Sequence, residues 1–337
     1  MWASKAFARG RPVAALTRLL KRNVGSTQRL AAPKQNVPIY KKFDDGFIIR
    51  GLRKEELDFI RLDAIKNLNA YPTKLETNIF YDCADPIPGA HFYAGEVEGQ
   101  LATSFVCYKI GPSIFAGSGS YTNPDFRTKN YWTRLHCWFL EQKPSVILGD
   151  IQSKFLVNTF ERLGWKKMFN VLAWQGYPPS LDRLPEGVVQ ATTMPLDKLV
   201  QYDVEHFIHP KAACRSRLLQ QFCHADGYLT LVALGKDQNT IGYAVRRPAE
   251  GGSFAVGPWY ADDIEIAERL LLGVTCGIPQ GVKFYVETWE PNEDVQILLE
   301  KHKFEVWETM YYIKYGQEYG VYRPWVYSVT SEDFCPC

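Results

Sequence analysis

The chain has 337 residues, of which 46% are hydrophobic and 23% are charged. This composition is typical of a folded protein and excludes disorder throughout, and the length predicts two domains. No apolar run approaches the roughly 20 residues that a membrane helix needs, so we expect no membrane partner.

The net charge of +2 conceals an uneven distribution. Residues 1–42 carry ten lysines and arginines and no acid, and the first acidic residue is Asp44. The rest of the chain holds 29 basic and 37 acidic side chains, a net charge of −8. A body this acidic argues against non-specific nucleic-acid binding.

Residues 1–42 have the pattern of a targeting segment. Apolar residues can gather on one side of a helix there, namely Phe7, Leu16, Leu19, Leu20 and Val24. An arginine-rich, acid-free, amphipathic segment is typical of a mitochondrial transit peptide, which predicts import into the matrix. Basic residues interrupt every candidate apolar core of a secretory signal. The alternative is a basic tail that touches nucleic acid.

The eight cysteines do not predict a metal site. Most are widely scattered, and without a secretory signal they are expected to be reduced. Cys335 and Cys337 form a close pair, but no companion pair has the spacing of zinc ligands.

Hydrophobic periodicity predicts the elements of the first half. They are a helix over 54–68, strands over 91–97, 101–110 and 113–121, a helix over 130–141, a strand over 146–151, a helix over 153–163 and a strand near 169–174. A Pro-rich stretch over 176–195 predicts a linker that divides a domain over 43–175 from one over 196–322, followed by a tail over 323–337.

The second half repeats this order. The expected elements are helices over 195–206 and 214–223, strands over 228–234, 240–246 and 254–259, a helix over 262–276, a strand over 282–288, a helix over 292–301 and a strand over 308–315. The repetition predicts two tandem copies of one α+β fold. Each copy would have a mixed, mostly antiparallel sheet with one parallel strand pair, flanked by helices.

Each half carries short motifs at characteristic places in this order of elements. The first half has NPDFR at 123–127 and FERLGW at 160–165, and the second half has GPWYAD at 257–262. Their order and spacing resemble the GNAT superfamily of N-acetyltransferases, in particular the two-domain proteins of the YitH type. The resemblance covers roughly residues 45–320 and implies tandem GNAT-like domains.

The resemblance also implies an activity, the transfer of an acyl group from acetyl-CoA or another acyl-CoA to an amine, without a metal. The acceptor would be a small-molecule amine, an amino acid or a protein, attacking directly in a ternary complex. A related possibility is a mitochondrial conjugating enzyme similar to glycine N-acyltransferase. The alternative from another class is a catalytically silent GNAT-like module that binds a ligand or partner.

The family pattern for holding the pyrophosphate is Arg or Gln, two residues, Gly, one residue, then Gly or Ala. The matching stretch makes five residues candidates for cofactor binding: Arg127, Thr128, Lys129, Asn130 and Tyr131. Asn130 and Trp132 stand where the pattern has small residues; Asn can adopt unusual backbone angles, and Trp132 would crowd the phosphate site unless its ring points away. A solvated basic turn is the alternative. In the second half, Asp262 and Asp263 follow the matching strand and are predicted to cap a helix.

Candidates for proton transfer are few. The family often places a tyrosine on the last helix, where this chain has Phe160 and Leu299. Asp150 and Glu287 lie in apolar strands that border the acyl cleft of such a fold, so they are the candidate catalytic bases. A solvent-facing carboxylate is the alternative for each. His136 lies among apolar residues and is expected to be a packed side chain.

Overall fold

The structure is a computed structural model that describes residues 37–57, 59–60, 91–111, 114–142, 144, 146–151, 154–206, 216–318 and 323–329. Its strands are β1 (Ile39–Lys42), β2 (Ile48–Gly51), β3 (His91–Val97), β4 (Gln100–Gly111), β5 (Ile114–Thr122), β6 (Val146–Ile151), β7 (Trp165–Gly176), β8 (Val188–Gln190), β9 (Leu229–Leu234), β10 (Thr240–Pro248), β11 (Phe254–Ala261), β12 (Phe284–Trp289), β13 (Glu305–Gly316) and β14 (Val326–Ser328). Its α-helices are α4 (Tyr131–Glu141), α5 (Lys154–Arg162), α6 (Leu196–His206), α7 (Ser216–His224), α8 (Ile264–Val274) and α9 (Glu293–Lys301).

Each half contains the predicted antiparallel meander followed by a parallel pair. Strands β3, β4 and β5 form the first meander, and β9, β10 and β11 form the second. The parallel pairs are β5 with β6 and β11 with β12. Residues 54–57 and 59–60 are helical, and the rest of the helix expected over 54–68 lies outside the described residues. The α+β fold class is therefore confirmed.

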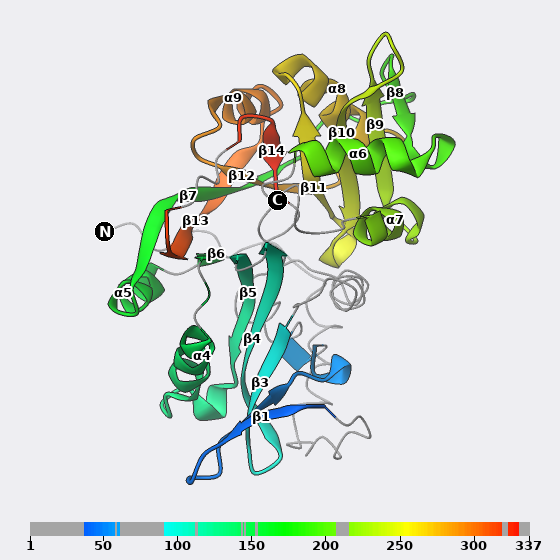
Figure 1. Ribbon diagram of the computed structural model, residues 1–337. Helices are drawn as coiled ribbons and strands as arrows, with labels where there is room; N and C mark the ends of the chain where they lie inside the picture. Colours follow the sequence, from blue (N-terminus) through cyan, green and yellow to red (C-terminus); the bar gives the residue numbers. More distant parts are fainter. Residues whose placement is uncertain are drawn as a thin grey trace, which may run out of the picture.

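The last long strand of each half is exchanged between the halves (Figure 1). Strand β13 of the second half pairs with β6 of the first, and β7 of the first half pairs with β12 of the second. β7 and β13 also pair with each other, so the described residues form one continuous sheet of 14 strands. The halves were expected to be separate domains, but the pairing of distant strands joins them.

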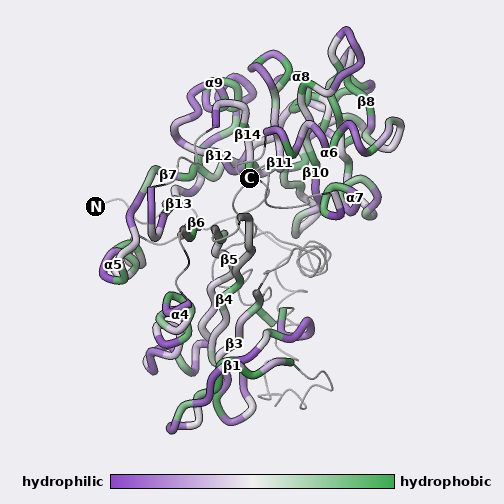
Figure 2. The backbone as a smooth tube through the Cα atoms, in the orientation of Figure 1, coloured by the Kyte–Doolittle hydropathy of each residue, from purple (hydrophilic) through white to green (hydrophobic). Residues whose placement is uncertain are grey.

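The sheet has two faces with different helices. Helices α6 and α7 contribute to a hydrophobic cluster that continues across both halves, from Leu101 through Met310 to Phe222. Two separate clusters lie on the opposite face, one under α8 and α9 and one under α4 and α5. We call the first the α6 face and the second the α8 face. Helix α6 alternates hydrophilic and hydrophobic residues, as expected for a helix with one buried side (Figure 2).

Three boundaries expected from the sequence differ in the structure. Residues 39–42 form β1, which pairs with β2, so the sheet includes the last residues of the expected leader. The expected linker contains β8, which pairs with β9 at the edge of the sheet. The expected tail contains β14, which pairs with β11. All three strands are short, so they have little periodicity for a sequence to show.

A buried ion-pair cluster fixes the start of the first half. The Arg50 guanidinium contacts the Glu56 carboxylate at 2.6 Å and the Glu96 carboxylate at 2.7 Å. It also donates to the Gly51 carbonyl, and the Arg53 backbone N–H donates to Glu56. Arg50 is only 2% exposed, so its single buried positive charge needs these partners.

Candidate functional site

The parallel strands of the first half are paired along only part of their length. The ladder runs from Ile114 opposite Val146 to Gly117 opposite Gly149. β5 continues to Thr122, and no strand of the described chain pairs with this continuation on its β6 side. We call this separation, β5 beyond Gly117 and β6 beyond Gly149, the first opening. Among the described strands, none pairs with the N–H and C=O groups of this part of β5 on that side.

The loop between β5 and α4 brings positive charge to the end of the first opening. Arg127, Thr128, Lys129 and Asn130 are exposed, and Arg127 donates to the Thr122 carbonyl at 3.4 Å. Asn130 has φ of 56°, the left-handed conformation that glycine usually supplies, and α4 begins at the next residue. No side chain caps this helix, so its N-terminal N–H groups add to an anion-attracting end.

The side chain of Trp132 does not cover the N-terminus of α4. Its ring stacks on the His136 ring at 4.8 Å and meets the Phe160 ring edge-on at 5.3 Å. His136 is fully buried, accepts a hydrogen bond from Trp165 Nε1, and burial lowers its pKa to about 4. These residues form the packed contact between α4 and α5, so the expectation of a packed His136 is confirmed.

The corresponding opening of the second half is filled by the chain itself. β11 pairs with β12 only from Phe254 to Val256, and then pairs with β14 instead, at Trp259 and Tyr260. On the other side of the inserted segment, the Val329 backbone N–H donates to the Glu287 carbonyl.

Side chains hold the inserted segment in place. Ser328 Oγ donates to the Val256 carbonyl at 2.9 Å, and Asn292 Nδ2 donates to the Val326 carbonyl at 2.8 Å. The Tyr327 ring packs on Trp259 in the cluster under α8 and α9. The segment therefore completes the core of this half.

The helix that follows β11 also differs from α4. The Asp263 side chain caps α8 by accepting from the Ile266 backbone N–H at 2.8 Å, as expected from the sequence. The Asp262 carboxylate accepts from the Tyr202 hydroxyl at 2.8 Å and lies 3.4 Å from His206 Nε2. Burial and the nearby Asp262 raise the pKa of Tyr202. Two carboxylates at this helix start disfavour a phosphate.

The two candidate bases lie far apart. Asp150 is opposite Tyr312 on β13, and Glu287 is opposite Ala173 on β7. The two residues are three strands apart across the sheet and four residues apart along the strands. Their Cα atoms are therefore on the order of 20 Å apart. Asp150 occupies the first position of β6 beyond the parallel ladder, at the first opening. Glu287 is 3% exposed and follows the last residue of β12 that pairs with β11.

The positions of the expected tyrosine hold buried apolar side chains. Phe160 and Leu299 are 6% and 0% exposed, and each is part of a cluster on the α8 face. Neither side chain can donate a proton. Within the described residues, no group of three or more potential metal ligands lies together, and no helix is long and apolar enough to cross a membrane.

No pattern in the sequence singles out Glu308, which the structure places near Glu287. Both residues are opposite Ala173, one on each neighbouring strand. Burial raises the pKa of Glu308. Only the register of the exchanged strands shows this neighbourhood, because the two glutamates are in different elements of the chain.

Comparisons with known proteins agree with the two-half architecture. Residues 199–319 match the family described as "Acetyltransferase (GNAT) domain". No curated protein sequence matches the chain.

Solved structures match both halves. A protein from Pyrococcus horikoshii has a TM-score of 0.68 at 15% identity, covering 87% of this chain and 97% of its own. A tandem GNAT protein from the clavulanic acid biosynthesis pathway has a TM-score of 0.58 at 12% identity, covering 80% of this chain and 98% of its own. A GCN5-related N-acetyltransferase from Sphaerobacter thermophilus has a TM-score of 0.54 at 17% identity, covering 81% and 96%. The chain therefore has a tandem GNAT fold.

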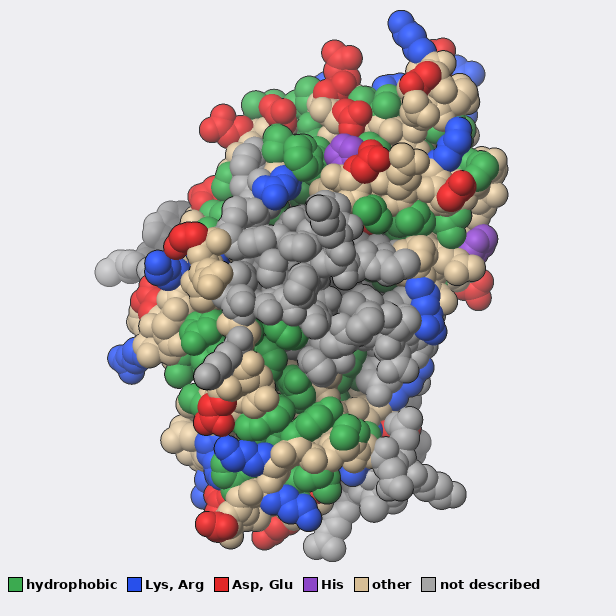
Figure 3. Space-filling view, in the orientation of Figure 1, with side chains coloured by type: hydrophobic (Ala, Val, Ile, Leu, Met, Phe, Trp, Pro, Cys, Tyr) green, Lys and Arg blue, Asp and Glu red, His purple; other side chains and the backbone are tan. Residues whose placement is uncertain are grey.

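Both acidic and basic side chains are exposed among the described residues. On the visible face, acidic and basic side chains are interspersed (Figure 3).

Proposed function

We propose that the protein is an acyl-CoA-dependent N-acyltransferase of the two-domain YitH type, with its donor site in the first opening. The observation that carries the proposal is the difference between the halves. The first opening leads to an uncapped helix start beside Arg127 and Lys129, whereas β14 fills the second opening and Asp263 caps its helix. Acetyl-CoA is the proposed donor, and an amine is the proposed acceptor.

Each proposed cofactor contact has a physical reason. The guanidinium of Arg127, the ammonium of Lys129 and the N–H groups at the start of α4 would hold the phosphates, with Thr128, Asn130 and Tyr131 shaping the turn. An N–H of β5 beyond Gly117 would donate to the thioester carbonyl and stabilise the charge that develops on its oxygen.

The transfer needs one base and no metal. The acceptor nitrogen forms a bond to the acyl carbon, the carbon–sulfur bond breaks, and the thiolate leaves. Asp150, beside the first opening, is the proposed base that takes the proton from the amine. Because Phe160 and Leu299 cannot donate a proton, the thiolate would be protonated by water.

The location of the protein is a further proposal. The basic, amphipathic segment before β1 supports import into the mitochondrial matrix. A fusion of residues 1–38 to a fluorescent reporter tests it. A mitochondrial signal is expected, and a diffuse or nuclear signal would contradict the proposal.

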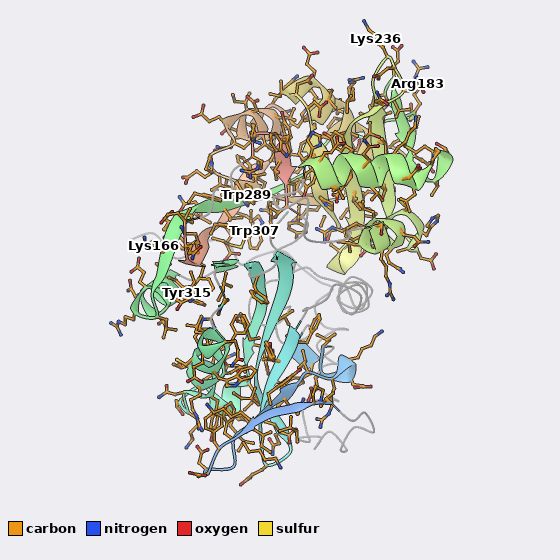
Figure 4. All side chains as sticks on the ribbon, viewed as in Figure 1. Lys166, Arg183, Lys236, Trp289, Trp307 and Tyr315 are labelled. Atoms are coloured by element: carbon orange, nitrogen blue, oxygen red, sulfur yellow. The ribbon has the colours of Figure 1, made fainter. Side chains whose placement is uncertain are left out.

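Calorimetric titration of the full chain with acetyl-CoA tests the donor site. We expect one acetyl-CoA per chain, and a loss of affinity of about tenfold for Arg127→Ala combined with Lys129→Ala. Lys236→Ala is the matched control, because Lys236 is an exposed cation at the far end of the second half (Figure 4). No heat of binding would overturn the proposal. Binding without transfer to any amine of a broad panel would favour the silent module instead.

A further inference from the structure

An acidic and aromatic cluster lies on the α6 face where the exchanged strands cross. Glu287 of β12 and Glu308 of β13 flank Ala173 of β7, and residues opposite one another in a sheet share a face. Their Cα atoms are about 10 Å apart. Because the Ala173 side chain between them is small, the two carboxylates can approach one positively charged group from opposite sides.

Aromatic side chains surround these carboxylates. Tyr285 and Trp289 lie on the same side of β12 as Glu287, two residues before and after it. Trp307, at a bulge of β13, contacts Tyr285 with ring centroids 6.3 Å apart. Figure 4 shows Trp289 and Trp307 in the region between the halves. Aromatic rings beside carboxylates are favourable neighbours for an ammonium group.

The cluster also contains donors for which the fold provides no acceptor. The indole N–H groups of Trp289 and Trp307 are buried and make no hydrogen bond in the described structure. Trp289 is 1% exposed, so leaving this donor unsatisfied is costly. A ligand that presents a carboxylate would satisfy it. The buried Arg247 lies on the Tyr285 side of the cluster, since it is opposite Ala255, which is opposite Tyr285. It adds positive charge there, on the same face of the sheet.

The distance from the donor site restricts which amine can react. Glu308 is four residues along β13 from Tyr312, which is opposite Asp150, so its Cα lies about 14 Å from that of Asp150. An amine bound between Glu287 and Glu308 is therefore too far away to attack a thioester at the first opening. A second amine, at the end of an extended side chain on the same molecule, would bridge this distance.

We propose that this cluster binds the α-ammonium and α-carboxylate of a diamino acid and presents its side-chain amine to the first opening. Glu287 and Glu308 hold the ammonium, and the indole N–H of Trp289 holds the carboxylate. The role as an acceptor site rests on the proposed acyl transfer, whereas the binding of the amino acid does not. Both glutamates are binding residues here, and Asp150 keeps the role of base.

Three probes separate the parts of this ligand: L-lysine, L-norleucine, which lacks the side-chain amine, and cadaverine, which lacks the carboxylate. Calorimetric titration of the full chain should give similar affinities for L-lysine and L-norleucine, and an affinity lower by about tenfold or more for cadaverine. With acetyl-CoA present, mass spectrometry should show acetylation of L-lysine on Nε and no product from L-norleucine.

Single substitutions test which side chains contact the three probes. Glu308→Gln should weaken all three probes by about tenfold or more, and Glu287→Gln should do the same. Trp289→Phe keeps an aromatic ring but removes the N–H, so it should weaken L-lysine and leave cadaverine unchanged. Glu300→Gln, an exposed carboxylate on α9 on the opposite face, is the matched control and should change nothing. Far-UV circular dichroism confirms folding, and the half-buried Glu308 provides a test if Glu287→Gln does not fold.

The outcomes distinguish this inference from the proposed function. Equal binding of the three probes, no binding of L-lysine, or unchanged affinities in Glu308→Gln and Trp289→Phe would overturn the site. Acetylation of Nα would overturn the assigned orientation. Binding of L-lysine with no binding of acetyl-CoA would support the site and overturn the donor assignment, and the reverse result would overturn the site alone.

Discussion

The inserted strand β14 makes a quantitative prediction about stability. Val326→Ala removes two methyl groups from a side chain that is 2% exposed and belongs to the cluster shared by both halves. At about 0.8 kcal/mol for each buried carbon, plus a cavity contribution, the free energy of unfolding should fall by about 2–3 kcal/mol. Val306→Ala is the matched control, since Val306 is also a strand residue but is 43% exposed, and it should cost less than about 0.5 kcal/mol.

Urea unfolding followed by far-UV circular dichroism measures both variants. Because the two substitutions carry the same loss of strand propensity, their difference reports the packing of β14. Equal losses of stability would refute the claim that β14 is a core strand. If β14 were instead a removable lid, Val326→Ala would leave the unfolding free energy unchanged and raise the number of acetyl-CoA molecules bound per chain from one to two.

Three further substitutions test other parts of the fold. Arg50→Met leaves the carboxylates of Glu56 and Glu96 without their buried partner and should cost about 3–5 kcal/mol in thermal unfolding. His136 has a pKa lowered from 6.5 to about 4, so below pH 6.5 the unfolded state gains a proton that the folded state excludes. The unfolding free energy should therefore fall as pH drops from 6.5 to about 4, by about 3 kcal/mol, and His136→Phe should remove this pH dependence in urea unfolding. Asp263→Ala should cost about 1 kcal/mol through loss of the helix cap, without adding acetyl-CoA binding in calorimetry, because β14 still fills the second opening.

Local patterns in the sequence were sufficient to predict most elements. The meander strands and the helices α4, α5 and α9 begin and end within a few residues of their expected positions, because alternation and helical periodicity are properties of short segments. The left-handed Asn130 and the cap at Asp263 were also predictable, since each depends on a single residue type at a chain turn.

The sequence did not predict features that depend on pairing between distant strands. Strands β7 and β13 pair with strands of the other half, and pairing between residues far apart in the chain leaves no local pattern in the sequence. The insertion of β14 has the same cause, because three residues carry almost no pattern. The neighbourhood of Glu287 and Glu308 follows only from the register of β12, β7 and β13.

The exchange of strands explains how the proposed donor site and the proposed acceptor site can belong to different halves. β13 pairs with β6 at the first opening and carries Glu308 beyond the end of that ladder, while β7 places Ala173 beside Glu287 of the second half. Hydrogen-bonded strands fix both the distance and the face of these residues more firmly than a linker between two domains would. β14 occupies the corresponding opening of the second half. In the proposed function its strands serve the acceptor, and a single continuous sheet connects this proposed acceptor site to the proposed donor site of the first half.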